Sequence, residues 1–388
     1  MSQDLLRQVL GRISHGPNLI SLKLVYNKLR HCEECSDEAT LLMEKIAALL
    51  SVARNDGCFR IKFAGMTNFW NKLSKPILAL APMDGVTDTA FRQVVVYAGK
   101  PDVLFTEFTN VDGLCSKGRD RLMERLKFTD GQHPIVAQIW GSDPAKFYQT
   151  AKLLRGMKFD GIDINMGCPQ RHVVKVGGGA GLVLKNQLVK EIIEATKKGA
   201  GGLPVSVKTR LGFDGIATEE WIGFLLSLDL PVITIHSRTA KEMSVPLARW
   251  EEIGKAVQLR NQLGSRTLIL GNGDIKDWRE AEDKMKKYGV DGVMIGRGVL
   301  ENIWLFNKNI DLAKITPADK AAILLKHLQI HLENLPDRPM RSDQAVGPVK
   351  KFVRTYINGF AGASDLRQEL VRAQSAEEMT AILTSFNH

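Results

Sequence analysis

The sequence contains little cysteine. Its 388 residues include five: Cys32, Cys35, Cys58, Cys115 and Cys168. So few cysteines in a chain of this length build no disulfide framework, which favours a reducing cytoplasm. Cys32 and Cys35 have the C-x2-C spacing of a zinc ligand pair, but the second pair that a structural zinc site needs is missing. We therefore expect no metal site.

Long apolar runs are also missing. The best run near the N-terminus, Ile46 to Ala53, is interrupted by Ser51 and is far shorter than the ~18 residues of a membrane span. It also lacks the small-residue cleavage site of a secretory signal peptide. These absences predict a cytoplasmic protein with no membrane partner, and no obligate protein partner is evident.

Charge of one sign is in excess. The chain has 53 Lys and Arg residues against 43 Asp and Glu residues, a formal net charge of +10 and a pI near 9.3. A basic balance favours a polyanionic partner, although it does not identify one. With 44% hydrophobic residues the chain can bury a large core, and an α/β barrel takes about 250 residues. We expect a barrel with additions.

Residues 1–65 carry no recognisable chemistry. Glycine and proline interrupt their short helical patterns at Gly11, Gly16, Pro17 and Gly57. The stretch from His31 to Gly57 resembles translated repeat-element sequence found at some bacterial gene starts. We expect this segment to be an extension that is disordered or not native, with Met66 as a candidate functional start.

From Pro76 onward, short apolar and β-branched runs alternate with amphipathic helical stretches. The eight predicted strands are Ile77–Met83, Asp102–Phe108, Pro134–Trp140, Gly161–Gly167, Pro204–Arg210, Pro231–Arg238, Thr267–Gly273 and Gly292–Gly298. Such alternation is typical of a parallel sheet covered by helices, and eight units close as a (β/α)8 TIM barrel. A doubly wound open sheet is the alternative, but it would more often carry a glycine-rich turn after the first strand. We predict a barrel over 66–310 and a smaller all-helical domain over 311–388.

Polar residues gather at the C-terminal ends of the predicted strands. They are Glu107, Asn110, Gln138, Asn165, Cys168, Lys208, Arg210, His236, Arg238, Asn272, Asp274 and Arg297. Active sites of such barrels lie at this end, and buried polar groups are costly unless they are paired. Seven strands with polar ends therefore predict a functional site.

Residue types suggest part of the chemistry. Gly271-Asn272-Gly273-Asp274 and Gly296-Arg297-Gly298 offer backbone N–H groups and an arginine where such barrels commonly hold a phosphate. Lys208 is suited to stabilising an anionic reduced flavin, with a Schiff-base lysine as the alternative. Cys168, between Gly167 and Pro169, fits a proton donor better than a nucleophile, because no His–acid pair adjoins it in the sequence.

Six ordered sequence blocks resemble the tRNA-dihydrouridine synthase family. They are Leu80–Asp88 followed by Phe91-Arg92, Ile164–Pro169, Val207–Gly212, His236–Ala240, Gly271–Ile275 and Asp291–Gly298. The resemblance covers about residues 70 to 385. It implies an FMN-dependent enzyme that reduces the C5–C6 bond of uridines in tRNA and is itself re-reduced by NADPH or NADH.

The resemblance also assigns roles residue by residue. Cys168 would protonate C5 after hydride reaches C6. The residues implied to hold FMN are Pro82, Met83, Gln138, Lys208, His236, Asn272, Gly273, Asp274, Gly296 and Arg297. Those implied to contact tRNA are Asn165, Arg171, Arg238, Lys350, Lys351 and Arg354, the last three at helical spacing in the C-terminal part.

The chain departs from the family pattern at three places. Ser237 replaces a frequent glycine, the usual aromatic residue and glycine are not obvious in Glu242–Leu247, and Phe352 replaces a histidine. Two other functions stay open at this point. One is another FMN barrel acting on a small molecule, as dihydroorotate dehydrogenase does, and the other is a non-catalytic tRNA-binding protein.

Overall fold

A closed parallel barrel forms the centre of the molecule. The computed structural model describes residues 68–335 and 342–386. Its strands are β1 (Ile77–Leu80), β2 (Leu104–Phe105), β3 (Thr109–Asn110), β4 (Ile135–Trp140), β5 (Gly161–Met166), β6 (Val205–Arg210), β7 (Val232–His236), β8 (Leu268–Asn272) and β9 (Gly292–Ile295). They run in the order β1-β9-β8-β7-β6-β5-β4-β2. A bridge between Ala79 and Val103 joins the two ends of the sheet. The predicted TIM barrel is therefore confirmed.

The second predicted strand is wrong as a single element. Asp102–Phe108 was expected to be continuous, but β2 ends at Phe105 and β3 begins at Thr109, and both pair with β4. The hydroxyls of Thr106 and Thr109 each donate to the carbonyl of Glu107, at 3.2 Å. Such local side-chain bonds compete with the strand ladder. Two short strands, β2 and β3, therefore take the place of the second predicted strand of the barrel.

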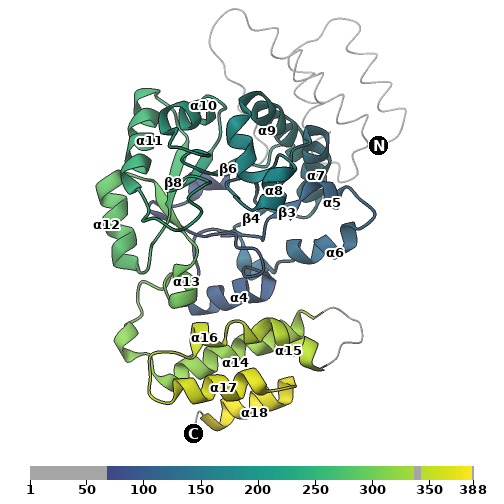
Figure 1. Ribbon diagram of the computed structural model, residues 1–388, viewed down its shortest axis with the longest axis vertical. Helices are drawn as coiled ribbons and strands as arrows, with labels where there is room; N and C mark the ends of the chain where they lie inside the picture. Colours follow the sequence, from purple (N-terminus) through teal and green to yellow (C-terminus); the bar gives the residue numbers. More distant parts are fainter. Residues whose placement is uncertain (1–67, 336–341, 387–388) are drawn as a thin grey trace, which may run out of the picture. The chain divides into compact units, whose positions relative to one another are not determined.

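Helices cover the outside of the barrel (Figure 1). The longer ones are α4 (Thr89–Ala98), α7 (Pro144–Gly156), α9 (Asn186–Ala200), α11 (Trp250–Gln262) and α12 (Trp278–Tyr288), and the shorter ones are α5 (Val111–Leu114), α6 (Arg119–Met123), α8 (Arg171–Lys175), α10 (Gly223–Leu226) and α13 (Gly298–Glu301). Side chains of Asp88, Asp143 and Asp277 accept backbone N–H bonds at the starts of α4, α7 and α12. These caps satisfy amides that would otherwise lack partners.

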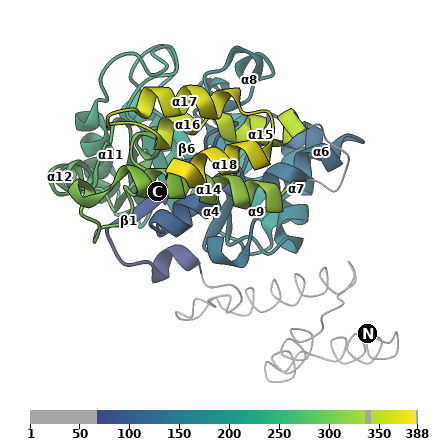
Figure 2. The same cartoon turned by 90° about the horizontal axis from the view of Figure 1, so that it is seen from below.

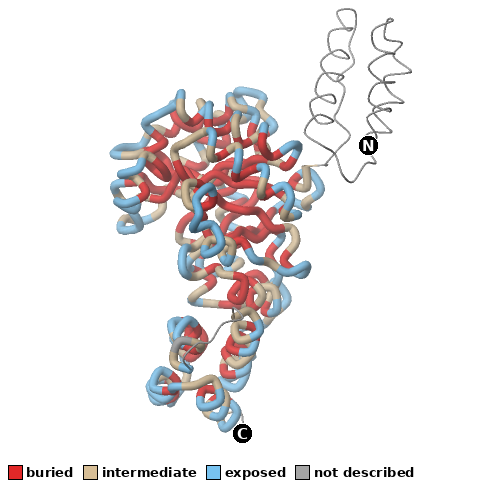
Figure 3. The backbone as a smooth tube through the Cα atoms, turned by 90° about the vertical axis from the view of Figure 1, so that its right-hand side faces the viewer, coloured by how far each residue is buried: buried red, intermediate tan, exposed pale blue. Residues whose placement is uncertain are grey.

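The core has two parts, which follow from strand alternation. Ile77 and Ala79 of β1 join a cluster inside the barrel, whereas Leu78 and Leu80 join the larger cluster beneath the helices. Trp70 belongs to the inner cluster and is 2% exposed. Figure 3 shows burial concentrated along the strands. The inner cluster fills one end of the barrel with apolar side chains, which leaves polar ones to the other end.

After the barrel, the described part of the chain forms the α-helices α14 (Pro317–Glu333), α15 (Ser342–Lys350), α16 (Val353–Tyr356), α17 (Ala363–Arg372) and α18 (Ala376–Phe386). Helix α14 packs on α4 of the barrel (Figures 1 and 2). Phe352 stacks on Phe91 of α4 with ring centroids 4.9 Å apart. The helical spacing predicted for Lys350, Lys351 and Arg354 is interrupted, because α15 ends at Lys350 and α16 begins at Val353.

The described residues, 68–335 and 342–386, belong to one compact unit. The predicted boundary at residue 310 therefore stays a prediction. The expectations for residues 1–65, including those for Cys32, Cys35 and Cys58, and for Met66 lie outside the described residues. Among the helices that the structure describes, none has the length and apolarity needed to cross a membrane.

Candidate functional site

A cavity of about 620 Å³ opens at the C-terminal ends of β1, β6, β7, β8 and β9. Most of the residues predicted to hold a cofactor line it: Pro82, Met83, Lys208, His236, Asn272, Gly273, Asp274, Gly296 and Arg297. Its volume lies in the range of small-molecule sites. The structure therefore brings these residues together around one cavity, and their role in holding a cofactor stays a prediction. Gln138, Asn165, Cys168, Arg171 and Arg238 are described by the structure but are not part of the cavity wall.

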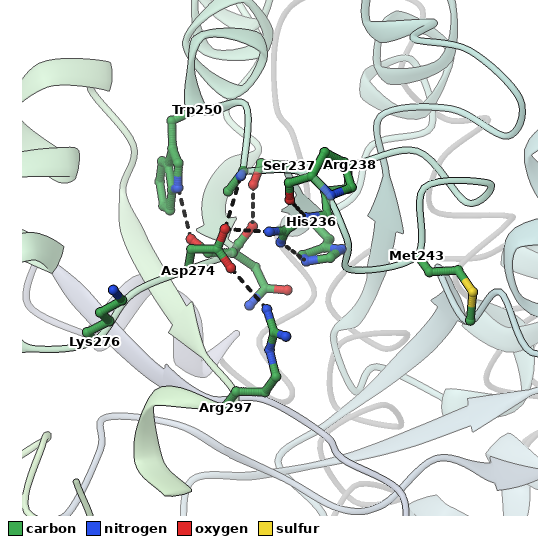
Figure 4. Close-up of polar contacts among 12 residues, drawn as sticks. His236, Ser237, Arg238, Met243, Trp250, Asp274, Lys276 and Arg297 are labelled. Atoms are coloured by element: carbon green, nitrogen blue, oxygen red, sulfur yellow. Dashed lines mark hydrogen bonds and ion pairs between the residues drawn. The ribbon is translucent and has the colours of Figure 1, made fainter. Parts of the chain in front are cut away.

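Asp274 joins two arginines at the edge of the cavity (Figure 4). Its Oδ2 accepts a bond from Arg238, and its Oδ1 accepts one from Arg297 at 3.0 Å. The backbone N–H of Ala248 also donates to Oδ2, at 3.0 Å. Burial alone would raise the pKa of this carboxyl, but the bond from Arg238 and its other donors bring the pKa below its ordinary value. The carboxylate is therefore a stable anion between two cations.

Glycine is required beside Asp274. Gly273 has φ +134°, and a Cβ there would collide with the hydroxyl of Ser237. That hydroxyl donates to the carbonyl of Asn272 at 3.0 Å, and Trp250 Nε1 donates to the carbonyl of Gly273 at 2.9 Å. These bonds fix the β8 turn, so the backbone can approach a ligand without a side chain in the way.

Lys208 supplies a partly buried cation to the cavity wall. Its Nζ donates to Asn272 Oδ1 at 3.1 Å, and Asn272 Nδ2 donates to the carbonyl of Met294 at 2.7 Å. Burial, and then the neighbouring charge of Arg210, lower the pKa of Lys208 to about 8. The ammonium is still mostly protonated at neutral pH, and an anionic ligand would stabilise it further.

His236 is a neutral base beside these cations. Burial, and then the charges of Lys208 and Arg210, hold its pKa well below the ordinary value. An arginine only donates hydrogen bonds. The 3.3 Å contact between Arg238 Nη1 and His236 Nε2 therefore makes Nε2 the acceptor. The imidazole thus carries its proton on Nδ1.

Arg238 itself is 2% exposed. Besides Asp274 and His236, it bonds the carbonyl of Pro246 through Nε, at 2.6 Å. Protein groups therefore occupy all three nitrogens of the residue that the sequence suggested as a tRNA contact.

Cys168 lies on the turn after β5 and is 9% exposed. Asn165 Oδ1 accepts the backbone N–H groups of Gly167 and Cys168 at 3.0 and 2.9 Å. Burial raises the pKa of the Cys168 thiol above its ordinary value, although Arg210 acts in the opposite direction. The thiol therefore keeps its proton at neutral pH.

Arg210 connects this turn to the cavity, whose wall it joins. Its Nε donates to the carbonyl of Gly167 at 2.6 Å, and its Nη1 donates to the carbonyls of Thr239 and Met243 at 2.9 and 2.6 Å. The turn that carries the thiol and the loop after β7 are thus held by one buried guanidinium.

A second, basic groove lies on the C-terminal helices. It has a volume of about 370 Å³, and its wall includes the predicted contacts Lys350, Lys351 and Arg354. Arg367 and Arg372 of α17 also line it. Sequence reasoning missed these two arginines, although their position in a helix with apolar residues on its other face was a usable signal. Arg171, also predicted to contact the substrate, is an exposed residue at the start of α8.

Fold and cavity together define a (β/α)8 barrel whose ligand site carries several cationic groups. The family model described as dihydrouridine synthase (Dus) matches residues 79–387. The chain belongs to this family, whose members are flavin-dependent oxidoreductases that act on a carbon–carbon double bond.

Similar proteins agree with this assignment. A Staphylococcus aureus protein named "Probable tRNA-dihydrouridine synthase" is 42% identical over 322 residues, which cover 82% of this chain and 95% of the relative. Bacillus subtilis "Probable tRNA-dihydrouridine synthase 2" is 41% identical over 322 residues, covering 82% and 96%.

Solved structures offer only distant likenesses. A variant of NCR from Zymomonas mobilis is 15% identical with a TM-score of 0.40, and covers 58% of this chain and 83% of its own. A 2-naphthoyl-CoA reductase complex is 12% identical with a TM-score of 0.47, covering 60% and 49%. These values say nothing about the substrate.

Proposed function

We propose that this protein is a tRNA-dihydrouridine synthase, which reduces the C5–C6 double bond of uridines in tRNA. The observation that carries the proposal is a buried, protonated thiol at Cys168, held beside a cationic barrel cavity in a chain of this family. A tRNA substrate fits the basic balance of the chain and a cytoplasmic location.

The cavity residues fit FMN. Lys208 and Arg297 provide cations for an anionic ring and a phosphate, and the turns at Gly273 and Gly296 let backbone N–H groups approach. Pro82, Met83, His236, Asn272 and Asp274 would complete the wall, with Gln138 contacting the ring from β4. Bound FMN, kept reduced by NADPH or NADH, would supply the hydride that C6 receives.

Cys168 would supply the proton. A thiol is a useful acid only while it is protonated, and burial keeps this one neutral. The turn is fixed through Asn165 and Arg210. The protein can therefore hold the Sγ proton at one place while C5 of the uracil becomes basic.

The tRNA would be held at two places. Asn165 and Arg171 would face the uracil, together with the loop that Arg238 supports. Lys350 and Arg354, joined by Arg367 and Arg372, would contact phosphates from the basic groove. Lys351 would add charge there while its Nζ donates to the carbonyl of Gly85 on the barrel, at 2.5 Å.

The test replaces Cys168 by alanine and uses Cys115→Ser as the control, because Cys115 is a free but exposed cysteine. We expect Cys168→Ala to keep its flavin absorbance and to lose at least about 100-fold in dihydrouridine formation, measured by nucleoside mass spectrometry. Cys115→Ser should behave like the parent. Unchanged dihydrouridine formation in Cys168→Ala would exclude this role. Turnover of free orotate in place of tRNA would favour a small-molecule reductase.

A further inference from the structure

Asp163 is a buried carboxylate that none of the steps above uses. It lies in β5 and is fully buried. The parallel register places it beside Gln138 of β4 and Ser206 of β6. Ser206 Oγ donates to Oδ1 at 2.6 Å, and Gln138 Nε2 donates to Oδ2 at 2.7 Å. Both carboxylate oxygens are thus bound by neutral donors inside the barrel.

The hydrogen bonds continue from Gln138 to the turn after β5 that carries Cys168. Asn165 Nδ2 donates to Gln138 Oε1 at 3.0 Å. Asn165 Oδ1 then accepts the backbone N–H groups of Gly167 and Cys168. An unbroken chain of side chains therefore leads from Asp163 to the residue that carries the thiol.

The direction of this chain is fixed by its ends. An ionised carboxylate only accepts hydrogen bonds, and a backbone N–H only donates, whereas a side-chain amide can be turned either way. Because Asp163 accepts, Gln138 turns its NH2 group toward it and its oxygen toward Asn165. Asn165 then presents its NH2 group to Gln138 and its oxygen to the Cys168 turn. A group at 163 that cannot accept a hydrogen bond removes this constraint.

We propose that Asp163 is a positioning residue for the reaction: it orients the Gln138 and Asn165 amides and, through them, the turn that holds Cys168. The inference rests on the proposed function, since Cys168 is the acid only in that reaction. It assigns no contact with substrate or cofactor to Asp163.

The test compares three variants of the full, flavin-loaded chain. Asp163→Ala removes the acceptor. Asp163→Asn keeps one, because its amide oxygen can accept from Gln138 while its NH2 group donates to Ser206 Oγ. Ser206→Ala is the matched control, since it removes a bond to the same carboxylate on the side away from Cys168.

Two measurements separate positioning from general destabilisation. The first is kcat and KM for tRNA. The second is the rate at which iodoacetamide alkylates Cys168, read by peptide mass mapping so that the other cysteines do not contribute. We expect Asp163→Ala to lower kcat by on the order of 10- to 100-fold with KM within about two-fold. In Asp163→Ala, iodoacetamide should also alkylate Cys168 at least about five-fold faster, because the turn that carries the thiol loses its support.

Asp163→Asn should return both values to within about five-fold of the parent, and Ser206→Ala should change neither by more than about two-fold. If Asp163→Asn is as impaired as Asp163→Ala, the charge acts on its own and positioning is excluded. If Ser206→Ala matches Asp163→Ala, the effect is general packing and the inference is overturned. The alkylation result does not depend on tRNA, so a parent protein that makes no dihydrouridine would contradict the proposed function separately.

Discussion

Asp274 binds two arginines that differ in burial, and this difference predicts unequal losses of stability. The side chain of Arg238 is 2% exposed, and that of Arg297 is 61% exposed. Asp274→Asn keeps the side-chain shape and suits the left-handed backbone at φ 48°, but it leaves the Arg238 guanidinium buried without an anion. Removing one partner of a buried pair costs about 3–5 kcal/mol, whereas an exposed pair is worth about 0–1 kcal/mol. We expect Asp274→Asn to lower the free energy of unfolding by about 3 kcal/mol and Arg297→Ala by less than about 1 kcal/mol.

Equilibrium urea unfolding of the full chain measures both losses. The FMN concentration must be equal in all samples, because a bound ligand adds to stability. A second substitution tests the cause: Arg238→Met in the Asp274→Asn background removes the buried charge, so it should recover part of the loss. Equal losses for Asp274→Asn and Arg297→Ala would refute the reasoning. A double variant less stable than Asp274→Asn would refute it too.

The ion pair between Asp274 and Arg238 also predicts how the free energy of unfolding depends on pH. The bonds from Arg238 and Ala248 outweigh burial and keep the pKa of Asp274 below its ordinary value. A carboxyl with a lowered pKa stabilises the fold above the unfolded pKa, and this contribution is lost as the pH falls through the folded pKa. The stability gap between the parent and Asp274→Asn should be constant above about pH 5 and should shrink below about pH 4. A gap that widens in acid would contradict the ion pair as its source.

Three further predictions concern other parts of the structure. Tyr356→Phe removes the hydroxyl bonded to buried His327 Nδ1 at 2.8 Å and should cost about 1–3 kcal/mol in the urea titration; no loss would mean that His327 needs no partner there. Combining Arg354→Gln with Arg367→Gln should lower the slope of log K for tRNA binding against log salt by about 1.5–2, and an unchanged slope would place the tRNA elsewhere. Burial raises the pKa of Asp163 to about 6, so ionisation costs stability as the pH rises from about 4 to about 7; Asp163→Asn should gain on the parent by up to about 3 kcal/mol over that range, and a gain that is absent would mean that its hydrogen bonds offset burial.

The barrel and most of the cavity wall could be predicted from the sequence, because both depend on periodic or local signals. Apolar runs alternating with helical patterns identify parallel strands, and the residue at the end of such a strand lies at the barrel mouth wherever the strand is placed. Lys208, Asn272 and Arg297 needed no tertiary information beyond that rule. The strand ends themselves were predicted too long: β1 ends at Leu80, not at Met83, because the backbone leaves the ladder before the apolar pattern ends.

Contacts between distant side chains could not be predicted in this way. The sequence places Arg238 at the end of a strand, and the family resemblance implied that it contacts tRNA. Its contacts with Asp274 and Pro246 depend on how two loops fold back over β7. Likewise, Arg367 reaches the groove of Arg354 only because α17 packs on α16. Charge spacing along one segment carries no signal of a partner segment.

The role of Asp163 could not be predicted from the sequence for a different reason. A single acid between Ile162 and Ile164 was visible as an exception in an apolar run, and a buried charge is costly enough to need a reason. That reason lies in the direction of hydrogen bonds, which composition does not record. Two amides and a carboxylate on neighbouring strands allow several networks. Only the register that sets Asp163 opposite both Gln138 and Ser206, with backbone N–H groups at the far end, leaves one. In the proposed reaction the position of Cys168 would therefore depend partly on Asp163, which is assigned no ligand contact. The register of β4, β5 and β6 is what brings Asp163 together with the amides that connect it to Cys168.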